Sequence, residues 1–417
     1  MLTNIYKCMC KLNNYCFKDH IMLLKKIANY IIVLLVIILI FTSCGKDQPT
    51  APEEVDLTNV KVSLSTYPNI GSNNTFFEFY VKIEPNANHL KEIRFDLNGD
   101  NVVDTVQISD DTLKTKLKNL GLNEVKSTIV FTDNSTLSSS IKVWVSQPKI
   151  ILKDGRPFFE PNIYNGKMIS VTHGTTHQAQ LINIDTYEIN CYLCDLNLDK
   201  FSEMHVTIPS FDGSKLLFDN GVSYDFCYTD ITAKDTTSID VPIDLVQYPV
   251  GKLTWSLDSK NIYGILRNTS DGNSGITSYN IETKEVKNIY SKGNYICVIP
   301  DQNDKLAILE KDDSGKHKLI IYNLKTNSIE TQYSDIPLAA PFRIIKNSDL
   351  IYFDGKLAFY SLSKKQIYYM RFDELNLADH MYGEADINME GNKFIIGTWD
   401  ANRALYEIDL SLSAFQE

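Results

Sequence analysis

Hydrophobic and polar residues alternate over short segments along most of this 417-residue chain. The alternation has the two-residue period of strands that bury one face, and Asn, Asp and Gly separate the segments as turn residues do. In residues 57–147 no helical period competes with it. Hydrophobic residues make up 43% of the chain, which is enough for packed cores. The pattern predicts an all-β protein.

The first folded unit is expected in residues 57–147, where the pattern predicts six short strands. These are Val60–Leu64, Phe76–Ile83, Leu90–Phe95, Val102–Ile108, Thr128–Phe131 and Ile141–Val145. Several short strands at this spacing are typical of an antiparallel sandwich.

A repeat fills residues 148–417, where a polar turn followed by an apolar strand recurs six times. One position of the turn advances along the chain by 48, 45, 45, 44 and 44 residues. It is occupied by Lys167, Lys215, Lys260, Lys305, Asp349 and Lys393. A further strand that closes in a polar turn follows each copy. Four strands in about 45 residues form one propeller blade, so the repeat predicts a six-bladed β-propeller.

The sixth copy of the repeat stops after its third strand, at residues 406–410. A complete blade needs a fourth strand, which has to come from elsewhere in the chain. We expect residues 149–153, just before the first blade, to supply it. This pairing would close the ring and cover two exposed sheet edges.

The first 45 residues follow a different pattern. Lys25 and Lys26 precede an apolar run from Ile27 to Phe41, which ends in the small residues Thr42 and Ser43 before Cys44. A charged start, a short apolar run and small residues at the end are the parts of a secretory signal. The run is shorter than the roughly 20 residues that span a bilayer as a helix. We therefore expect a cleaved signal rather than a permanent membrane helix.

The residues around Cys44 resemble the lipobox of bacterial lipoproteins, with Phe41 where Leu is commoner. This resemblance implies that residues 1–43 are a signal peptide and that lipid is attached to Cys44. Residues 44–56, which are polar and rich in proline, then form an extended tether. The implied location is the cell envelope, at the outer membrane. Met22 begins a complete signal of its own, so we expect translation to start there.

The charge balance limits the partners of the exported part. Removing residues 1–43 leaves 36 basic and 51 acidic residues, a net charge of −15. A body this acidic repels nucleic acid and anionic lipid. Nucleic acid is therefore excluded as the intended partner. We expect the membrane to be contacted through the lipid anchor, and the ligand to be a protein or a glycan.

Two further resemblances refine the expected fold. Residues 93–104, in which an aromatic residue and Asp96 precede an Asp/Gly turn, are similar to the hairpin of PKD domains, although Arg94-Phe95 stands where that family has Trp. Residues 253–263, which contain Trp255, resemble the WD-like blades of TolB-type propellers. The resemblances imply an immunoglobulin/PKD-like sandwich in residues 57–147, followed by a six-bladed TolB-like propeller in residues 148–417.

A possible calcium site lies in the PKD-like hairpin. Oxygen-bearing side chains stand at mostly alternate positions, as calcium ligands do: Asp96, Asn98, Asp100 and Asp104. An EF-type loop needs Gly at its sixth position and a carboxylate at its twelfth, where this chain has Asn101 and Gln107. The favoured alternative is a polar turn made tight by Asn98 and Gly99.

All five histidines of the propeller are expected on one face, formed by the loops between second and third strands and between blades. They are His173, His177, His205, His317 and His380. Histidines at the mouth of a propeller can hold a metal or act as acid and base. The chain has no His-Glu-x-x-His motif, and residues 272–275 do not form a nucleophile elbow. Structural or solvated loop histidines are therefore the favoured interpretation.

Cys191 and Cys194 are the other residues with possible chemistry. In an exported protein they could form a disulfide or redox pair, but no second such pair exists for zinc, so apolar filling is favoured. Two classes of function remain: a binding or scaffold lipoprotein, and a propeller enzyme such as a metal-dependent polysaccharide lyase or hydrolase. The fold does not decide between them. Since no catalytic motif is recognisable, the sequence favours binding.

Overall fold

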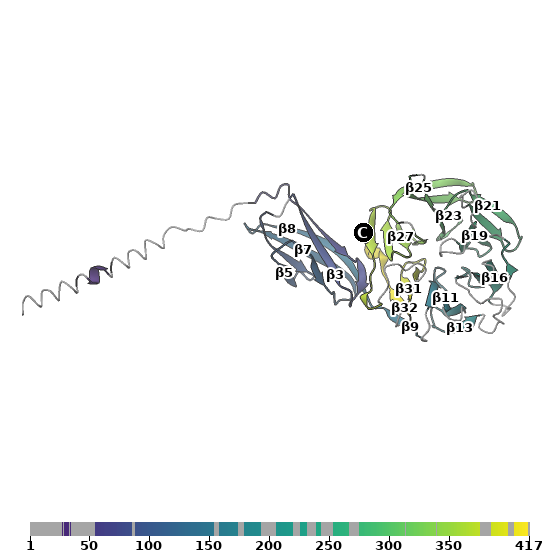
Figure 1. Cartoon of the computed structure of the whole chain (residues 1–417), viewed down its shortest axis with the longest axis horizontal. Helices are drawn as coiled ribbons and strands as arrows, with labels where there is room; N and C mark the ends of the chain where they lie inside the picture. Colours follow the sequence, from purple (N-terminus) through teal and green to yellow (C-terminus); the bar gives the residue numbers. More distant parts are fainter. Residues whose placement is uncertain are drawn as a thin grey trace, which may run out of the picture. The chain divides into compact units, whose positions relative to one another are not determined.

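A computed structural model describes residues 27, 29–32, 34, 55–85, 88–153, 158–173, 179–192, 206–219, 226–231, 239–242, 253–266, 275–312, 314–338, 340–375, 385–398 and 404–415. From residue 55 onward these residues form strands, turns and two short 3-10 helices, as expected of an all-β protein (Figure 1). Residues 27, 29–32 and 34 are helical and exposed. No helix in the described ranges has the length and apolar character needed to cross a membrane.

Residues 61–146 form the predicted sandwich. One sheet has the order β1 (Lys61–Tyr67), β3 (Phe77–Glu84), β6 (Leu113–Thr115). The other has the order β2 (Ile70–Ser72), β8 (Thr136–Ser146), β7 (Gly121–Phe131), β4 (Leu90–Asp96), β5 (Thr105–Gln107). Alternate residues of both sheets are buried, among them Phe77 and Phe79 in β3 and Phe95 in β4. Such alternation is what packs two sheets face to face.

Two details of the sandwich differ from the sequence prediction. The short strands β2 and β6 were not expected. The strand predicted for Val102–Ile108 is limited to β5, because the preceding residues form a turn. The backbone N–H groups of that turn bond to side-chain carboxylates, with Asn101 donating to Asp96 and Leu97 donating to Asp104.

The propeller consists of six four-stranded sheets within the described residues, arranged in a ring (Figure 1). Blade one contains β10 (Phe158–Asn162), β11 (Met168–His173), β12 (Ala179–Asn183) and β13 (Ile189–Tyr192). Blade two contains β14 (Thr207–Pro209), β15 (Lys215–Asp219), β16 (Phe226–Asp230) and β17 (Ile239–Asp240). Blade three contains β18 (Leu253–Trp255), β19 (Asn261–Ile265), β20 (Ile276–Asn280) and β21 (Val286–Tyr290). Blade four contains β22 (Tyr295–Ile299), β23 (Gln302–Lys311), β24 (His317–Asn323) and β25 (Ser328–Ile336). Blade five contains β26 (Phe342–Ile344), β27 (Leu350–Phe353), β28 (Ala358–Ser361) and β29 (Gln366–Tyr369). The six-bladed fold predicted from the repeat is confirmed.

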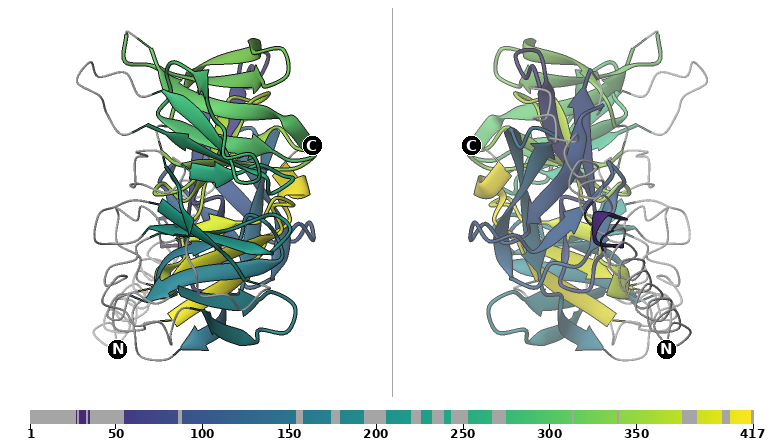
Figure 2. Two further views of the ribbon diagram at one scale, coloured as in Figure 1. Left: turned by 90° about the vertical axis from the view of Figure 1, so that its right-hand side faces the viewer. Right: turned by 90° about the vertical axis from the view of Figure 1, so that its left-hand side faces the viewer.

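The sixth blade is completed as the sequence predicts. It contains β30 (Ala385–Ile387), β31 (Lys393–Gly397), β32 (Ala404–Asp409) and β9 (Lys149–Lys153), in that order. Leu405 of β32 pairs with Leu152 of β9, and both pack in one cluster with Ile395. The yellow C-terminal strands lie beside the blue-green strands of β9 and blade one in the side views of Figure 2. The 3-10 helices η2 (Asp373–Leu375) and η3 (Leu412–Phe415) follow blade five and blade six.

Burial falls from the axis to the rim of each blade. The second and third strands are covered on both faces, and runs such as residues 306–309 in β23 are therefore apolar throughout instead of alternating. The fourth strands are more exposed, most clearly β25, which exposes eight of its nine residues. The ring thus presents polar turns at one end and its most exposed strands on the outside.

The unexpected strand β2 contacts the propeller as well as the sandwich, within one compact unit of the chain. It pairs in parallel with β8, and Ile70 forms an isolated parallel bridge with Met370. The backbone N–H of Asn69 donates to the carbonyl oxygen of Tyr369 at 2.9 Å. Ile70 is fully buried in the cluster that also contains the core of blades five and six.

Candidate functional site

The residues predicted to lie on the histidine face are only partly described. His177, His205 and His380 lie outside the described residues, as does the lipidation candidate Cys44. The backbone of His173 ends β11, and His317 begins β24, so both flank second-to-third strand connections as expected. Partial burial, together with the nearby Lys311, lowers the pKa of His317. Convergence of the five histidines stays a prediction.

The cysteine pair is also only partly described. Cys191 lies in β13, the outermost strand of blade one, and Cys194 lies outside the described residues. A disulfide between them therefore stays a prediction. Cys227 and Cys297 are buried thiols, which donate to Asp240 and to the Tyr164 hydroxyl.

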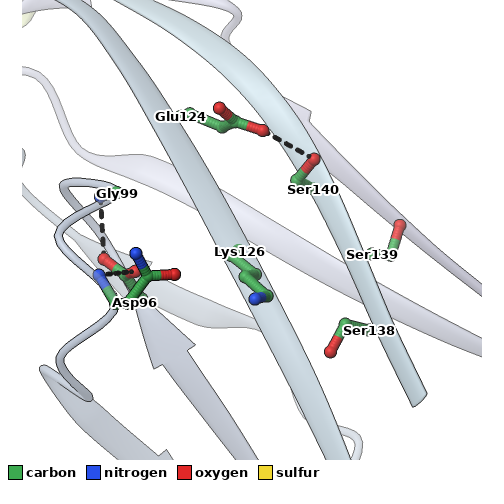
Figure 3. A pocket seen from close by; sticks show the side chains of 8 residues that line it. Asp96, Gly99, Glu124, Lys126, Ser138, Ser139 and Ser140 are labelled. Atoms are coloured by element: carbon green, nitrogen blue, oxygen red, sulfur yellow. Dashed lines mark hydrogen bonds between the residues drawn. The ribbon is translucent and has the colours of Figure 1, made fainter.

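The candidate calcium residues form a hydrogen-bonded turn, of which Figure 3 shows Asp96 with its bond from Gly99. One Asp96 carboxylate oxygen accepts the backbone N–H of Gly99 at 2.7 Å, and the other accepts that of Asn101 at 2.8 Å. Asp100 accepts the side-chain amide of Asn98, and Asp104 accepts the N–H of Leu97. Within the described ranges, no group of three or more His, Cys, Asp and Glu side chains is arranged to hold a metal. These hydrogen bonds stabilise a tight polar turn by themselves; calcium binding stays a prediction.

At the axis of the ring, a tyrosine from blade one reaches the opposite blades. Tyr164 follows β10 and is 4% exposed. Its hydroxyl lies 3.1 Å from the carbonyl oxygen of Val298 in blade four and 3.0 Å from that of Ile344 in blade five. Burial raises the pKa of Tyr164 well above its usual range, so the hydroxyl keeps its proton. The space beside Tyr164 and Trp255 measures about 10 Å³, about the minimum for one water. Side chains of blades one, two, three and five therefore pack closely around this space.

A buried ion pair lies next to Tyr164. Nε of Arg343 in β26 lies 2.9 Å from a carboxylate oxygen of Asp386 in β30, and the two side chains are 8% and 5% exposed. The other Asp386 oxygen accepts the backbone N–H of Ile163 at 2.9 Å. The Arg343 guanidinium also stacks over the Tyr164 ring, 4.9 Å from its centre. These groups join blades one, five and six.

Sequence reasoning missed these axial residues, although a signal was present. Arg343 stands between Phe342 and Ile344, and Asp386 stands between Ala385 and Ile387, each in the short strand before a repeat turn. A charged residue inside an apolar strand is costly unless it is paired. Two opposite charges at the same place in neighbouring copies could therefore have been proposed as a pair.

The six turns between first and second strands form a continuous surface, here called the turn face. Neighbouring turns are linked by hydrogen bonds, as by Asn165 Nδ2 donating to the carbonyl oxygen of Ser210 at 3.0 Å, and by Asn303 Nδ2 donating to Asp258 at 3.0 Å. Blades five and six are linked by the N–H of Lys346, which donates to the carbonyl oxygen of Met389. Hydrogen bonds thus link these turns in succession from blade one to blade six.

Individual turns are fixed by a recurring serine and aspartate. In blade two, Asp212 accepts hydrogen bonds from the hydroxyls of Ser210 and Ser214 and from the Ser214 N–H. Partial burial alone would raise the pKa of Asp212, but these bonds outweigh it and lower the pKa to about 2. Asp258 accepts from Ser256 in the same way in blade three. These carboxylates therefore remain charged at neutral pH and stabilise the turns.

A groove opens on the turn face between blades four and five. Its volume is about 530 Å³, within the usual range for ligand sites. The turn between β22 and β23 is short, since only Pro300 and Asp301 connect the two strands. Asn303 donates to Asp258 in blade three, on the side of the turn away from blade five. Residues lining this turn-face groove are Ile299, Pro300, Asp301, Gln302, Ile344, Ile345, Lys346, Asn347, Ser348 and Asp349. The lining thus combines apolar side chains with polar and charged ones.

Comparisons with known proteins add little to this description. The sequence matches no protein-family profile and no curated protein. Among solved structures, it is similar to an oligogalacturonate lyase from Vibrio parahaemolyticus (9% identity, 85% of this chain and 99% of that chain, TM-score 0.44). An oligogalacturonate lyase in complex with manganese (9%, 78% and 99%, 0.43) and TolB from Acinetobacter baumannii (12%, 71% and 78%, 0.36) are also similar. At these values the fold assignment rests on the strand pairing itself.

Proposed function

We propose that this chain is a lipid-anchored binding protein of the bacterial cell envelope. It binds its ligand through the propeller and does not act on a substrate. The turn-face groove is the observation that carries the proposal. It lies on turns that are hydrogen-bonded to their neighbours, and its lining combines apolar with polar and charged side chains, as protein-binding surfaces do. A protein segment is the ligand that this arrangement fits.

Charge in the groove supports a polar segment with both signs of charge. Lys346 and Asp301 form an ion pair of 2.8 Å across the groove, with side chains 34% and 64% exposed. Because both remain accessible, a ligand can exchange this pair for pairs of its own at little cost.

Site-specific photocrosslinking tests the groove as a ligand site. A photoreactive amino acid at the exposed Gln302 is expected to give a discrete adduct in native envelopes, because Gln302 lies at the border of the groove. The matched control carries it at Lys287, an exposed residue of the outer strand β21. Adducts would be separated by electrophoresis and identified by mass spectrometry. The same adducts from both positions, or none from Gln302, would contradict the proposal.

Lipid attachment is tested separately. Cells given an alkyne-bearing fatty acid are expected to label the wild-type protein, and Cys44→Ser is expected to lose the label completely, because the thiol is the acyl acceptor that the lipobox resemblance implies. The variant should also move from the detergent phase to the aqueous phase, since each buried methylene of the lipid contributes about 0.8 kcal/mol to membrane binding. Equal labelling of both proteins would refute the anchor at Cys44.

Metal analysis distinguishes the binding proposal from the enzyme alternative. We expect mass spectrometry of protein purified from residue 46 onward to find neither stoichiometric transition metal nor calcium. A transition metal that is lost in His173→Ala or His205→Ala would overturn the proposal in favour of a metal-dependent lyase or hydrolase. Calcium that is lost in Asp96→Asn would establish the site in the sandwich instead.

A further inference from the structure

The sandwich carries a groove that the proposed function does not use. It lies between the Asp96 turn and the strands β7 and β8, and its volume is about 320 Å³ (Figure 3). The side chains that border it include Asp96, Asn101, Glu124, Lys126, Ser138 and Ser140. This sandwich groove is at the lower end of the usual size of small-molecule sites, about 300–1,000 Å³.

The walls of the sandwich groove are fixed by the backbone. Asp96 holds one wall by accepting the N–H groups of Gly99 and Asn101. Gly99 has a φ of +76°, and a Cβ there would lie only 3.2 Å from the carbonyl oxygen of Glu124. The turn therefore packs directly on β7, where only glycine fits. The other wall consists of two paired strands, in which Lys126 lies opposite Ser140.

The groove offers both donors and acceptors of hydrogen bonds. Ser140 donates to one Glu124 carboxylate oxygen at 3.1 Å, and no hydrogen bond to the other is found among the described residues. The Lys126 ammonium has no hydrogen-bond or ion-pair partner within the part of the chain that the structure describes. Figure 3 shows Lys126 between the Asp96 turn and the serines of β8. An ammonium can donate up to three hydrogen bonds, and a carboxylate can accept several.

Charge restricts the class of ligand. Two carboxylates and Lys126 line the groove, and Lys142 lies opposite Glu124 in β8, so the groove has no excess of positive charge and the body around it is acidic. Sulfates, phosphates and uronic acids are therefore disfavoured by repulsion. A neutral ligand whose hydroxyls both donate and accept can use Glu124, Lys126 and the serines together.

We propose that the sandwich groove binds a neutral oligosaccharide, with one or two sugar rings between the Asp96 turn and β8. The sugar hydroxyls donate to Glu124 and accept from Lys126. This site is independent of the turn-face groove, so the protein can hold a glycan through the sandwich and a protein segment through the propeller.

Isothermal calorimetry on the full mature chain with Cys44→Ser tests the proposal. The probes are maltohexaose, cellohexaose and xylohexaose, with a hexagalacturonate as the anionic comparison. At least one neutral probe is expected to bind, and Lys126→Ala and Glu124→Ala are each expected to weaken it at least tenfold. Lys118→Ala, at an exposed position outside the groove, and Gln302→Ala, in the turn-face groove, should leave it unchanged.

Each other outcome would overturn the proposal. No heat from any neutral probe would exclude this ligand class, and tighter binding of the hexagalacturonate would show that the charge argument is wrong. Unchanged binding in Lys126→Ala and Glu124→Ala would place the sugar elsewhere. Circular dichroism is the control that each variant is folded, and the Gln302 adduct tests the proposed propeller function independently of this result.

Discussion

Asp386→Ala is expected to destabilise the propeller by about 3–5 kcal/mol, the cost of leaving one partner of a buried ion pair uncompensated. Arg343 is then left buried beside Tyr164 with its charge unpaired, and the N–H of Ile163 loses its acceptor. Asp386 lies in the innermost strand of blade six and Ile163 in blade one, so the loss also weakens the closure of the ring. Urea unfolding followed by circular dichroism measures the change in the free energy of unfolding.

Two controls separate the ion pair from a general effect of substitution. Arg343→Met combined with Asp386→Leu should recover most of the lost stability, because replacing both buried charges with apolar side chains removes the cost of burying them. Lys316→Ala breaks the ion pair between Lys316 and Asp335, whose side chains are each 67% exposed. This substitution should lower the free energy of unfolding by less than about 1 kcal/mol. A loss below about 1 kcal/mol for Asp386→Ala would mean that the pair does not stabilise the axis.

Replacing Lys149–Lys153 with Gly-Ser-Gly-Ser-Gly should lower the melting temperature by roughly 10 °C. Ile151 and Leu152 leave their cluster with Ile395, a loss of about 2–3 kcal/mol for two half-buried aliphatic chains. Unpairing β9 from β32 removes a similar amount in ladder hydrogen bonds, at about 1 kcal/mol each. At about 2–4 °C per kcal/mol, these losses together give the expected shift. Calorimetry of the soluble chain measures it.

The control for this replacement lies in the same strand. Ile150 is 49% exposed, so Ile150→Ser leaves the pairing of β9 intact and should change the melting temperature by only a few degrees. If the five-residue replacement unfolds at the wild-type temperature, β9 does not stabilise the ring, even though it completes the sixth sheet.

The candidate sites were less accessible to sequence reasoning than the fold. The oxygen-bearing residues after Asp96 suggested a calcium loop, but the same side chains accept backbone N–H groups, and their spacing suits both roles. Glu124 and Lys126 lie two residues apart on one strand, and this spacing by itself indicates only a polar face of a sheet. Their relation to the Asp96 turn depends on how β4 and β7 lie in one sheet, which the local pattern does not contain.

The sequence by itself determined the all-β class, the six blades and the use of residues 149–153 to complete the last one. These properties follow from periodicity, which is a local property repeated along the chain. Only the tertiary structure decided that Tyr164 meets the carbonyl oxygen of Ile344, 180 residues away, and that Arg343 meets Asp386. Closure of the ring brings such residues together. The turn-face groove likewise depends on how the turns of blades four and five are placed beside each other. Neither leaves a period in the sequence.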